Sequence, residues 1–167
     1  MITADARRLM LALAGRSALA GCTALAVAPM AALAGGPGGF PQGTWLLDET
    51  ASRPLAATSQ ALDIIDDDGQ SLSFNLKKTG ENGATEVMSW HGTYGGAPHL
   101  IEGSSILFAV AHGPGGSILI SGQLADTGKL KEKCHIAPDR QRFRCDGTFW
   151  GSDGKKRTYV EIYHLQR

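Results

Sequence analysis

The sequence predicts an all-β protein, a single antiparallel up-and-down β-barrel of about eight to ten strands. From Gly43 onward, apolar and polar residues alternate with a period of two, as in half-buried strands. Turn-forming pairs such as Asn82-Gly83 and Asp153-Gly154 separate these runs. Short strands joined by tight turns hide their edges best by closing into a barrel, which predicts a closed sheet rather than an open one.

The first 34 residues differ from the rest and are typical of a signal peptide. Arg7 and Arg8 precede an Ala/Leu-rich stretch that ends in the small-x-small pattern of residues 32–34. Arg16 interrupts this stretch, so a Sec-type signal and a twin-arginine signal both remain open. A lipoprotein is a minor alternative, because residues 19–22 look like a lipobox that would place a lipid anchor on Cys22. We therefore expect an exported protein, either periplasmic or secreted.

After this signal peptide at 1–34, we expect a flexible glycine-rich leader at 35–42 and one barrel domain at 43–167. The whole chain has 16 basic and 16 acidic residues, and the signal peptide holds three basic residues and one acidic residue. The mature chain therefore has 13 basic and 15 acidic residues, a net charge of −2. This balance argues against nucleic acid as a partner. No later apolar run approaches the ~20 residues of a membrane helix, so we expect no transmembrane segment after signal removal.

Two cysteines remain in the mature chain, and their surroundings predict a hairpin with its turn at 138–140. If the turn is centred there, the numbers of facing residues sum to 279, which places Cys134 directly opposite Cys145. We expect these two residues to form a disulfide in an oxidising compartment. The alternative is a reactive thiol pair or a metal site with His135. Because adjacent residues of a strand point to opposite faces, Cys134 and His135 are poor partners for one metal ion.

The alternation assigns one face of each strand to the interior. The residues expected on these faces are Leu72, Phe74 and Leu76; Ile106, Phe108, Val110 and His112; Ile118, Ile120 and Leu124; Phe143, Cys145 and Phe149; and Val160, Ile162 and His164. An interior built from residues such as Leu72, Phe108 and Phe143 is too apolar for a sugar or a nucleotide.

The segment Gly43-Thr44-Trp45 resembles the opening of lipocalins and the wider calycin group. The chain is also similar to small exported bacterial lipocalin-like proteins in its segments 92–98 and 153–155, and this resemblance spans most of residues 43–165. It implies that Trp45 is structural and plugs one end of the barrel. It also implies that a basic residue near the last strand, Arg157 or Arg167, stacks on Trp45 through a cation–π contact. The resemblance implies fold more than function.

The candidate ligand-binding residues lie where the predicted interior faces end. His112 and His164 each follow an apolar face, so we expect them at the mouth of the barrel with Tyr94. His99 lies in a glycine-rich segment that could gate this mouth. These residues, together with Trp90 and Phe108, form the predicted ligand-binding set, although each polar group could simply form a hydrogen bond at the rim. No HExxH or His-x-His motif, P-loop or dinucleotide fingerprint is present, so we expect no metal and no cofactor.

A second polar group is predicted on the last two strands. If facing residues sum to about 307, then Arg144 lies opposite Tyr163 and Asp146 lies opposite Glu161. Two carboxylates placed in this way could share a proton and act as an acid/base pair. The favoured interpretation is a solvated outer face on which Arg144 bridges the charges.

Three functions from different classes remain open at this point. The first is a non-catalytic binding protein for a small apolar or aromatic ligand. The second is a calycin-type lyase or isomerase, in which His112, His164 or Tyr94 would act as acid and base in a dry pocket. It requires two titratable groups within hydrogen-bond reach inside the cavity. The third is an envelope interaction module with a filled barrel and an exposed apolar patch or sheet edge.

Overall fold

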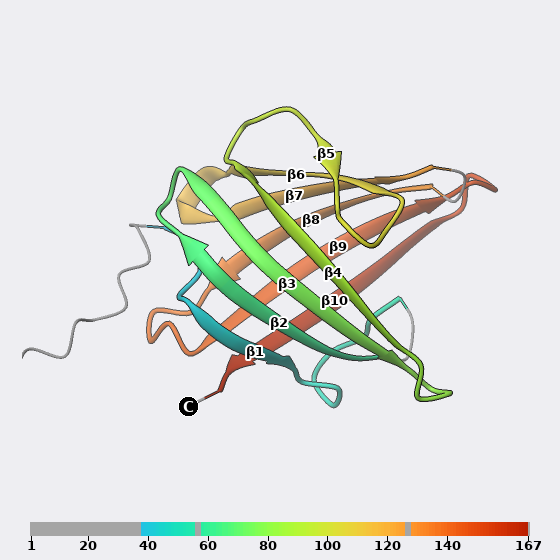
Figure 1. The fold of residues 1–167 in the computed structure, drawn as a ribbon, viewed down its shortest axis with the longest axis horizontal. Helices are drawn as coiled ribbons and strands as arrows, with labels where there is room; N and C mark the ends of the chain where they lie inside the picture. The colour runs from blue at the N-terminus through green and yellow to red at the C-terminus, as the bar shows by residue number, and fades with distance from the viewer. Residues whose placement is uncertain (1–37, 56–57, 126–127, 167) are drawn as a thin grey trace, which may run out of the picture. The chain divides into compact units, whose positions relative to one another are not determined.

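Ten antiparallel strands form a nearly closed barrel (Figure 1), and this confirms the predicted fold class. The computed structural model describes residues 38–55, 58–125 and 128–166. The strands are β1 (Gly43–Leu47), β2 (Thr58–Asp67), β3 (Ser71–Gly80), β4 (Thr85–Thr93), β5 (His99–Leu100), β6 (Ile106–His112), β7 (Ile118–Leu124), β8 (Gly128–Ile136), β9 (Arg142–Gly151) and β10 (Lys156–Leu165). A short 3-10 helix, η1 (Pro114–Gly116), joins β6 to β7. Among the described residues, no helix is long and apolar enough to cross a membrane.

The strands pair in the order β4-β3-β2-β1-β10-β9-β8-β7-β6-β5, so nearly every strand pairs with its neighbours in sequence. β4 and β6 do not pair with each other as strands, and the segment that contains β5 lies between them (Figure 1). Glu102 N donates to Ser89 O at 2.8 Å, and Ser89 N donates back to Glu102 O at 3.1 Å. Gly95 N also donates to Val110 O at 2.8 Å. These bonds satisfy backbone groups that an open sheet edge would leave unpaired.

Alternate residues of each strand point into the barrel, as the period of two predicts. Leu72, Phe74, Phe108, Ile120 and Phe143, all expected inside, line the interior. Leu119, which neighbours Ile120, is 37% exposed. The barrel is therefore apolar inside and polar outside over most of its wall.

The described part of the predicted leader, residues 38–42, packs against the barrel. Phe40 is 2% exposed and lies edge-on to the Phe143 ring, with the ring centroids 4.9 Å apart. Arg140 Nη2 donates to Gly39 O at 2.8 Å. The predicted signal peptide at 1–34, including Cys22, and residues 35–37 lie outside the described residues.

The Cys134–Cys145 disulfide is present and confirms the predicted pairing. The two residues are register partners on β8 and β9, and their Cα atoms lie 4.0 Å apart. They lie directly opposite each other, as the expected sum of 279 requires.

The register between β9 and β10 differs from the prediction by one residue. Phe143 pairs with Tyr163, and Cys145 pairs with Glu161, so facing residues sum to 306 rather than 307. A shift of one residue moves every side chain of a strand to the other face of the sheet. The expectation that Val160, Ile162 and His164 face the interior is therefore wrong, and Tyr159, Glu161 and Tyr163 point inward instead. Asp146 pairs with Val160, not with Glu161.

Candidate functional site

The barrel encloses a cavity of about 230 Å³ that is neither sealed nor a shallow groove. Most of its wall is apolar. The apolar lining residues are Phe40, Leu55, Leu62, Ile64, Leu72, Phe74, Leu76, Met88, Ile101, Ile106, Phe108, Ile120, Leu130, Phe143 and Cys145, and the polar ones are Gln60, Lys78, Glu132, Tyr159, Glu161 and Tyr163. For comparison, an engineered apolar cavity of about 150 Å³ binds benzene. This cavity is large enough for a molecule of one or two aromatic rings.

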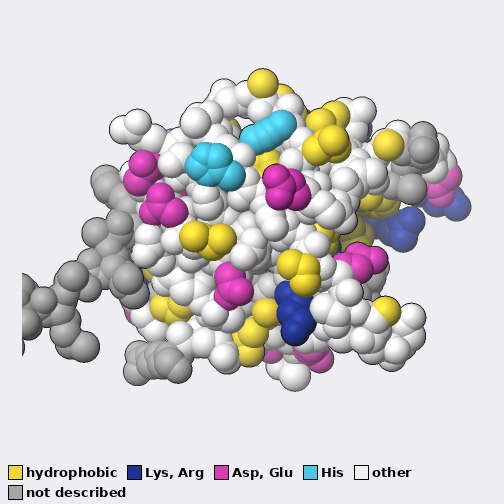
Figure 2. Space-filling model, in the orientation of Figure 1, with side chains coloured by type: hydrophobic (Ala, Val, Ile, Leu, Met, Phe, Trp, Pro, Cys, Tyr) yellow, Lys and Arg dark blue, Asp and Glu magenta, His cyan; other side chains and the backbone are white. Residues whose placement is uncertain are grey.

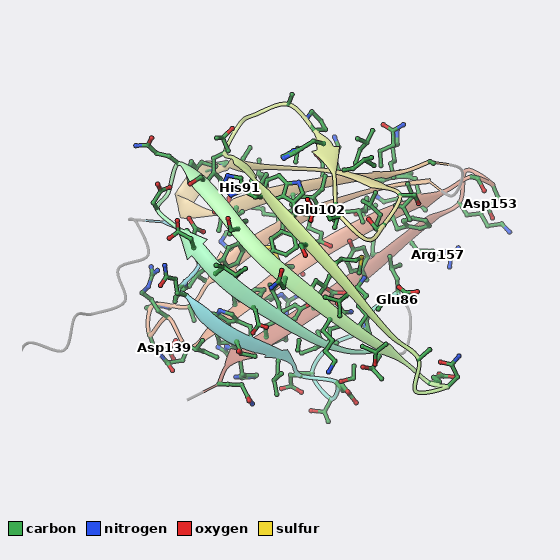
Figure 3. All side chains as sticks on the ribbon, in the orientation of Figure 1. Glu86, His91, Glu102, Asp139, Asp153 and Arg157 are labelled. Atoms are coloured by element: carbon green, nitrogen blue, oxygen red, sulfur yellow. A yellow bond between two sulfur atoms is a disulfide. The ribbon has the colours of Figure 1, made fainter. Side chains whose placement is uncertain are left out.

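One end of the barrel, here called the plugged end, is closed by the rings of Phe40, Trp45 and Phe143. Trp45 is fully buried, and its Nε1 donates to Pro41 O at 3.0 Å. Its ring lies 4.9 Å from that of Phe143. The predicted stacking of Arg157 on Trp45 is wrong: Arg157 lies over Phe149, 5.6 Å from the ring centroid, near the opposite end of β10 (Figure 3). Arg167 lies outside the described residues.

Asp67 is the central hydrogen-bond acceptor of the plugged end. It is fully buried and accepts hydrogen bonds from Phe40 N at 2.7 Å, Gly69 N at 3.0 Å and Tyr94 Oη at 2.7 Å. A β-bulge between Ile64 and Asp66 shifts the register of β2 and turns Asp67 inward. Burial and the Asp67 hydrogen bond raise the pKa of Tyr94 far above its usual value.

Four of the six predicted ligand-binding residues form two stacked pairs near this end, outside the cavity lining. Tyr94 stacks on His112 with ring centroids 4.1 Å apart, and His112 Nε2 donates to Gly69 O at 2.8 Å. Trp90 stacks on His99 at 4.8 Å, and His99 Nε2 donates to His91 O at 2.7 Å. Figure 3 shows His91 near the plugged end of β4. Trp90 Nε1 is buried and has no hydrogen-bond partner among the described residues.

The other two predicted residues lie apart from these pairs. Phe108 lines the cavity and contacts Trp90 edge-on, with the ring centroids 4.9 Å apart. His164 lies on the outer face of β10, where its Nε2 is 3.3 Å from Asp48 Oδ2 and its side chain is 51% exposed. Of the three residues considered as an acid/base group, Tyr94 and His112 are therefore in contact, whereas His164 lies apart from both on the outer face.

The polar side chains of the cavity gather in its other half, here called the carboxylate end. Glu132 on β8, Gly147 on β9 and Tyr159 on β10 are neighbours across the sheet. Tyr159 Oη donates to Glu132 Oε1 at 2.5 Å, so its ring must cross the position of Gly147. A Cβ on Gly147 would collide with that ring. Glycine at this position is what allows the tyrosine to reach the carboxylate.

Glu161 lies two residues after Tyr159 on β10, and its carboxylate accepts hydrogen bonds from two side chains. Tyr163 Oη donates to Glu161 Oε2 at 3.0 Å, and Gln60 Nε2 donates to Glu161 Oε1 at 3.2 Å. Tyr163 Oη also lies 3.1 Å from Gln60 Oε1. Glu161 thus has an interior partner network rather than the solvated surroundings that we expected.

Burial, and then the negative charge of Glu161, raise the pKa of Glu132 to about 7. The hydrogen bond from Tyr159 and the positive charge of Lys78 oppose this rise. Burial and the nearby glutamates raise the pKa values of Tyr159 and Tyr163 far above the usual value, so both phenols stay protonated. Near neutral pH, Glu132 can therefore both gain and lose a proton inside the barrel.

Charged groups at the rim of this end are mixed in sign. Lys78 on β3 lines the cavity and is partly exposed, and the exposed Glu86 is its register partner on β4. Arg157 is exposed beside Phe149, and its charge acts on Asp153 in the β9–β10 turn. The polar lining residues Lys78, Glu132 and Glu161 are all partly exposed, and the lining residue Leu55 is 39% exposed. The cavity therefore meets solvent at the carboxylate end.

One group of potential metal ligands occurs here, but its chemistry does not fit a metal ion. Glu132, Cys134 and Cys145 place one ligand atom each within 4.8 Å of one another. Because the two cysteines are joined in a disulfide, they offer no thiolate, and Glu132 remains as a single anionic ligand. The group is thus a structural disulfide beside a carboxylate.

Sequence reasoning missed Gln60, Lys78 and Glu132 and assigned Glu161 to the outer face. The alternation of faces along β8 could have identified Glu132, because Glu132 lies two residues from the predicted disulfide residue Cys134 and therefore shares its face. The same pairing rule, applied with the correct register, places Glu161 beside Cys145. Gln60 gave no such signal, because its strand lacks a clear apolar alternation.

No protein-family model matches this chain, and no curated protein matches it either. The geometry of the site is therefore the basis for its chemistry. That geometry combines an apolar cavity, two carboxylates and two protonated tyrosines.

Proposed function

We propose that this protein is an exported carrier that holds a small apolar or aromatic molecule inside its barrel. The cavity of about 230 Å³ carries this proposal. Binding sites for small molecules are concave and mostly apolar, with a few placed polar groups, and this cavity has that composition. Phe74 and Phe108 offer aromatic faces, and their ring centroids lie 5.5 Å apart.

Titration with indole and toluene by isothermal calorimetry tests the proposal. The variant Ile120→Trp fills the cavity from β7, and Leu119→Trp adds the same side chain on the outer face of the same strand. We expect micromolar to millimolar binding in the wild type, a loss of tenfold or more in Ile120→Trp, and no change in Leu119→Trp. No binding of either probe to the wild type would overturn the proposal.

Export is part of this proposal and rests on the signal-like residues 1–34 and on the disulfide. Mass spectrometry of the mature protein tests it. A mature chain that begins at Gly35 supports cleavage by a signal peptidase, and a lipidated Cys22 supports the lipoprotein route. A chain that retains Met1 with free thiols contradicts export.

A second candidate function is acid/base catalysis in the same cavity. It is favoured by the two Tyr–Glu hydrogen bonds, because Tyr159–Glu132 and Tyr163–Glu161 are titratable pairs within hydrogen-bond reach inside the barrel. A lyase or isomerase needs such a pair. A ligand found by the titration should then be converted over time by the wild type and not by Glu132→Gln. A ligand that is recovered unchanged after incubation with the wild type would contradict catalysis and would be compatible with the carrier function.

The third candidate, a filled barrel that serves as an interaction module, is disfavoured by the cavity itself. Exposed apolar residues such as Leu100 and Val87, each 59% exposed, occur on the outer wall. On the face in Figure 2, the hydrophobic side chains of described residues are scattered among polar and charged ones. This pattern gives no extended apolar contact surface on that face.

A further inference from the structure

The polar groups inside the cavity offer more hydrogen-bond acceptors than donors. Each ionised carboxylate has about four acceptor positions. The bonds from Tyr159, Tyr163 and Gln60 fill three positions on Glu132 and Glu161. A molecule that enters the cavity with a donor group would therefore find free acceptor capacity at the carboxylate end.

The charges around the two carboxylates leave the interior negative. Among the groups that face Glu132, β10 contributes Glu161 and the neutral Tyr159 and Tyr163, and β2 contributes the neutral Gln60. The nearby cation is Lys78, which lies at the rim and is partly exposed. Arg157 and Glu86 lie further out and are exposed. Lys78, Glu132 and Glu161 are all half-buried, so this one lysine offsets at most one of the two carboxylates when both are ionised, and a net negative charge remains.

We propose that the cavity selects small aromatic or aliphatic molecules that carry a protonated amine, and that Glu132 and Glu161 hold the ammonium group. This inference rests on the proposed carrier function. An ammonium group supplies three donors and a positive charge, which matches two carboxylates beside a low-dielectric apolar wall. A carboxylic acid of the same shape would place a third negative charge there. The cavity volume suits an amine with one or two rings.

Three molecules with the same indole ring and different side-chain charge test this selectivity. Tryptamine is cationic, tryptophol is neutral and indole-3-propionate is anionic at pH 7.5. We expect tryptamine to bind the oxidised wild-type protein at least tenfold more tightly than tryptophol, and indole-3-propionate to bind most weakly. Calorimetric titration under identical salt measures all three.

Isosteric variants test whether the preference for tryptamine depends on the two carboxylates. Glu132→Gln and Glu161→Gln should each weaken tryptamine binding about tenfold and leave tryptophol binding within about twofold. Retained tryptophol binding shows that the variant barrel is folded. The matched control is Glu102→Gln, whose exposed side chain lies beside β5 (Figure 3), and it should change neither affinity.

A pH series gives a measurement that needs no variant. Protons compete with the amine for Glu132, whose raised pKa lies near 7, so tryptamine affinity should rise between pH 5.5 and 8 while tryptophol affinity stays flat. Equal or tighter binding of indole-3-propionate would overturn this inference and leave the carrier function standing. Failure of all three molecules, together with indole and toluene, would overturn the carrier function as well.

Discussion

The two ends of the barrel bury polar groups by different means. At the plugged end, Asp67 is fully buried but accepts three hydrogen bonds, and aromatic rings fill the surrounding space. At the carboxylate end, Glu132 and Glu161 also accept hydrogen bonds, but a cavity remains beside them. The plugged end therefore satisfies its polar groups from within the chain, whereas the carboxylate end keeps capacity for a ligand.

The largest expected effect comes from removing the plug. Trp45→Ala leaves a large void beside Phe143 and removes the hydrogen bond to Pro41 O, so the free energy of unfolding should fall by about 4 kcal/mol. Urea denaturation measures this change. The control Trp150→Ala, on a half-buried ring near the carboxylate end, should cost about 1 kcal/mol. Equal losses would remove the distinction between the two ends.

The disulfide joins the strands midway between the two ends and should contribute the next largest effect. The double variant Cys134→Ala, Cys145→Ala removes a cross-link between residues 11 apart in sequence. In the chain-entropy model a loop of this size contributes about 3 kcal/mol. Urea denaturation of the oxidised wild type and of the double variant measures it. A stability difference close to zero would show that the neighbouring backbone pairs hold this region without help.

A methyl group on Gly147 tests the packing that positions Tyr159. Gly147→Ala forces the tyrosine ring to move, which should cost about 2 kcal/mol and separate Tyr159 from Glu132. Thermal and urea denaturation measure the loss. The control Gly80→Ala places its methyl group near the exposed side chain of Asn82 and should change the free energy of unfolding by less than about 1 kcal/mol. An unchanged Gly147→Ala protein would show that the ring has another position.

The smallest expected effect is the pH dependence of stability that Glu132 creates. Burial and Glu161 raise the pKa of Glu132 from 4.5 to about 7, so the folded state binds this proton more tightly than the unfolded state. The free energy of unfolding should therefore fall as the pH rises from about 4.5 to about 7, by about 1–2 kcal/mol for a partly exposed side chain, and then level off.

Urea denaturation at pH 5 and pH 8 measures this fall. Glu132→Gln should flatten it, and Glu102→Gln should keep it. A fall of the same size in Glu132→Gln would assign the proton to another group and weaken the contrast between the two ends.

Particular residues show how far the sequence predicts the site. The alternation in β3, β6 and β7 places Leu72, Phe108 and Ile120 correctly, because period two determines the face once one residue is assigned. In β10 both faces carry bulky residues, so alternation alone cannot choose between them. Which face of β10 points inward depends on the β9–β10 register. Because the predicted register was wrong by one residue, His164 was expected inside the barrel and Glu161 outside, whereas the structure has the reverse.

The sequence by itself determined an all-β barrel, its turns and its disulfide, because these depend on local alternation, turn residues and a short hairpin. Only the tertiary structure decided which polar groups meet inside the barrel. The bulge that turns Asp67 toward Phe40 and Tyr94, and the glycine that lets Tyr159 cross to Glu132, each join residues 27 apart in sequence. Such contacts depend on how strands pack around a closed wall, and no local pattern encodes them.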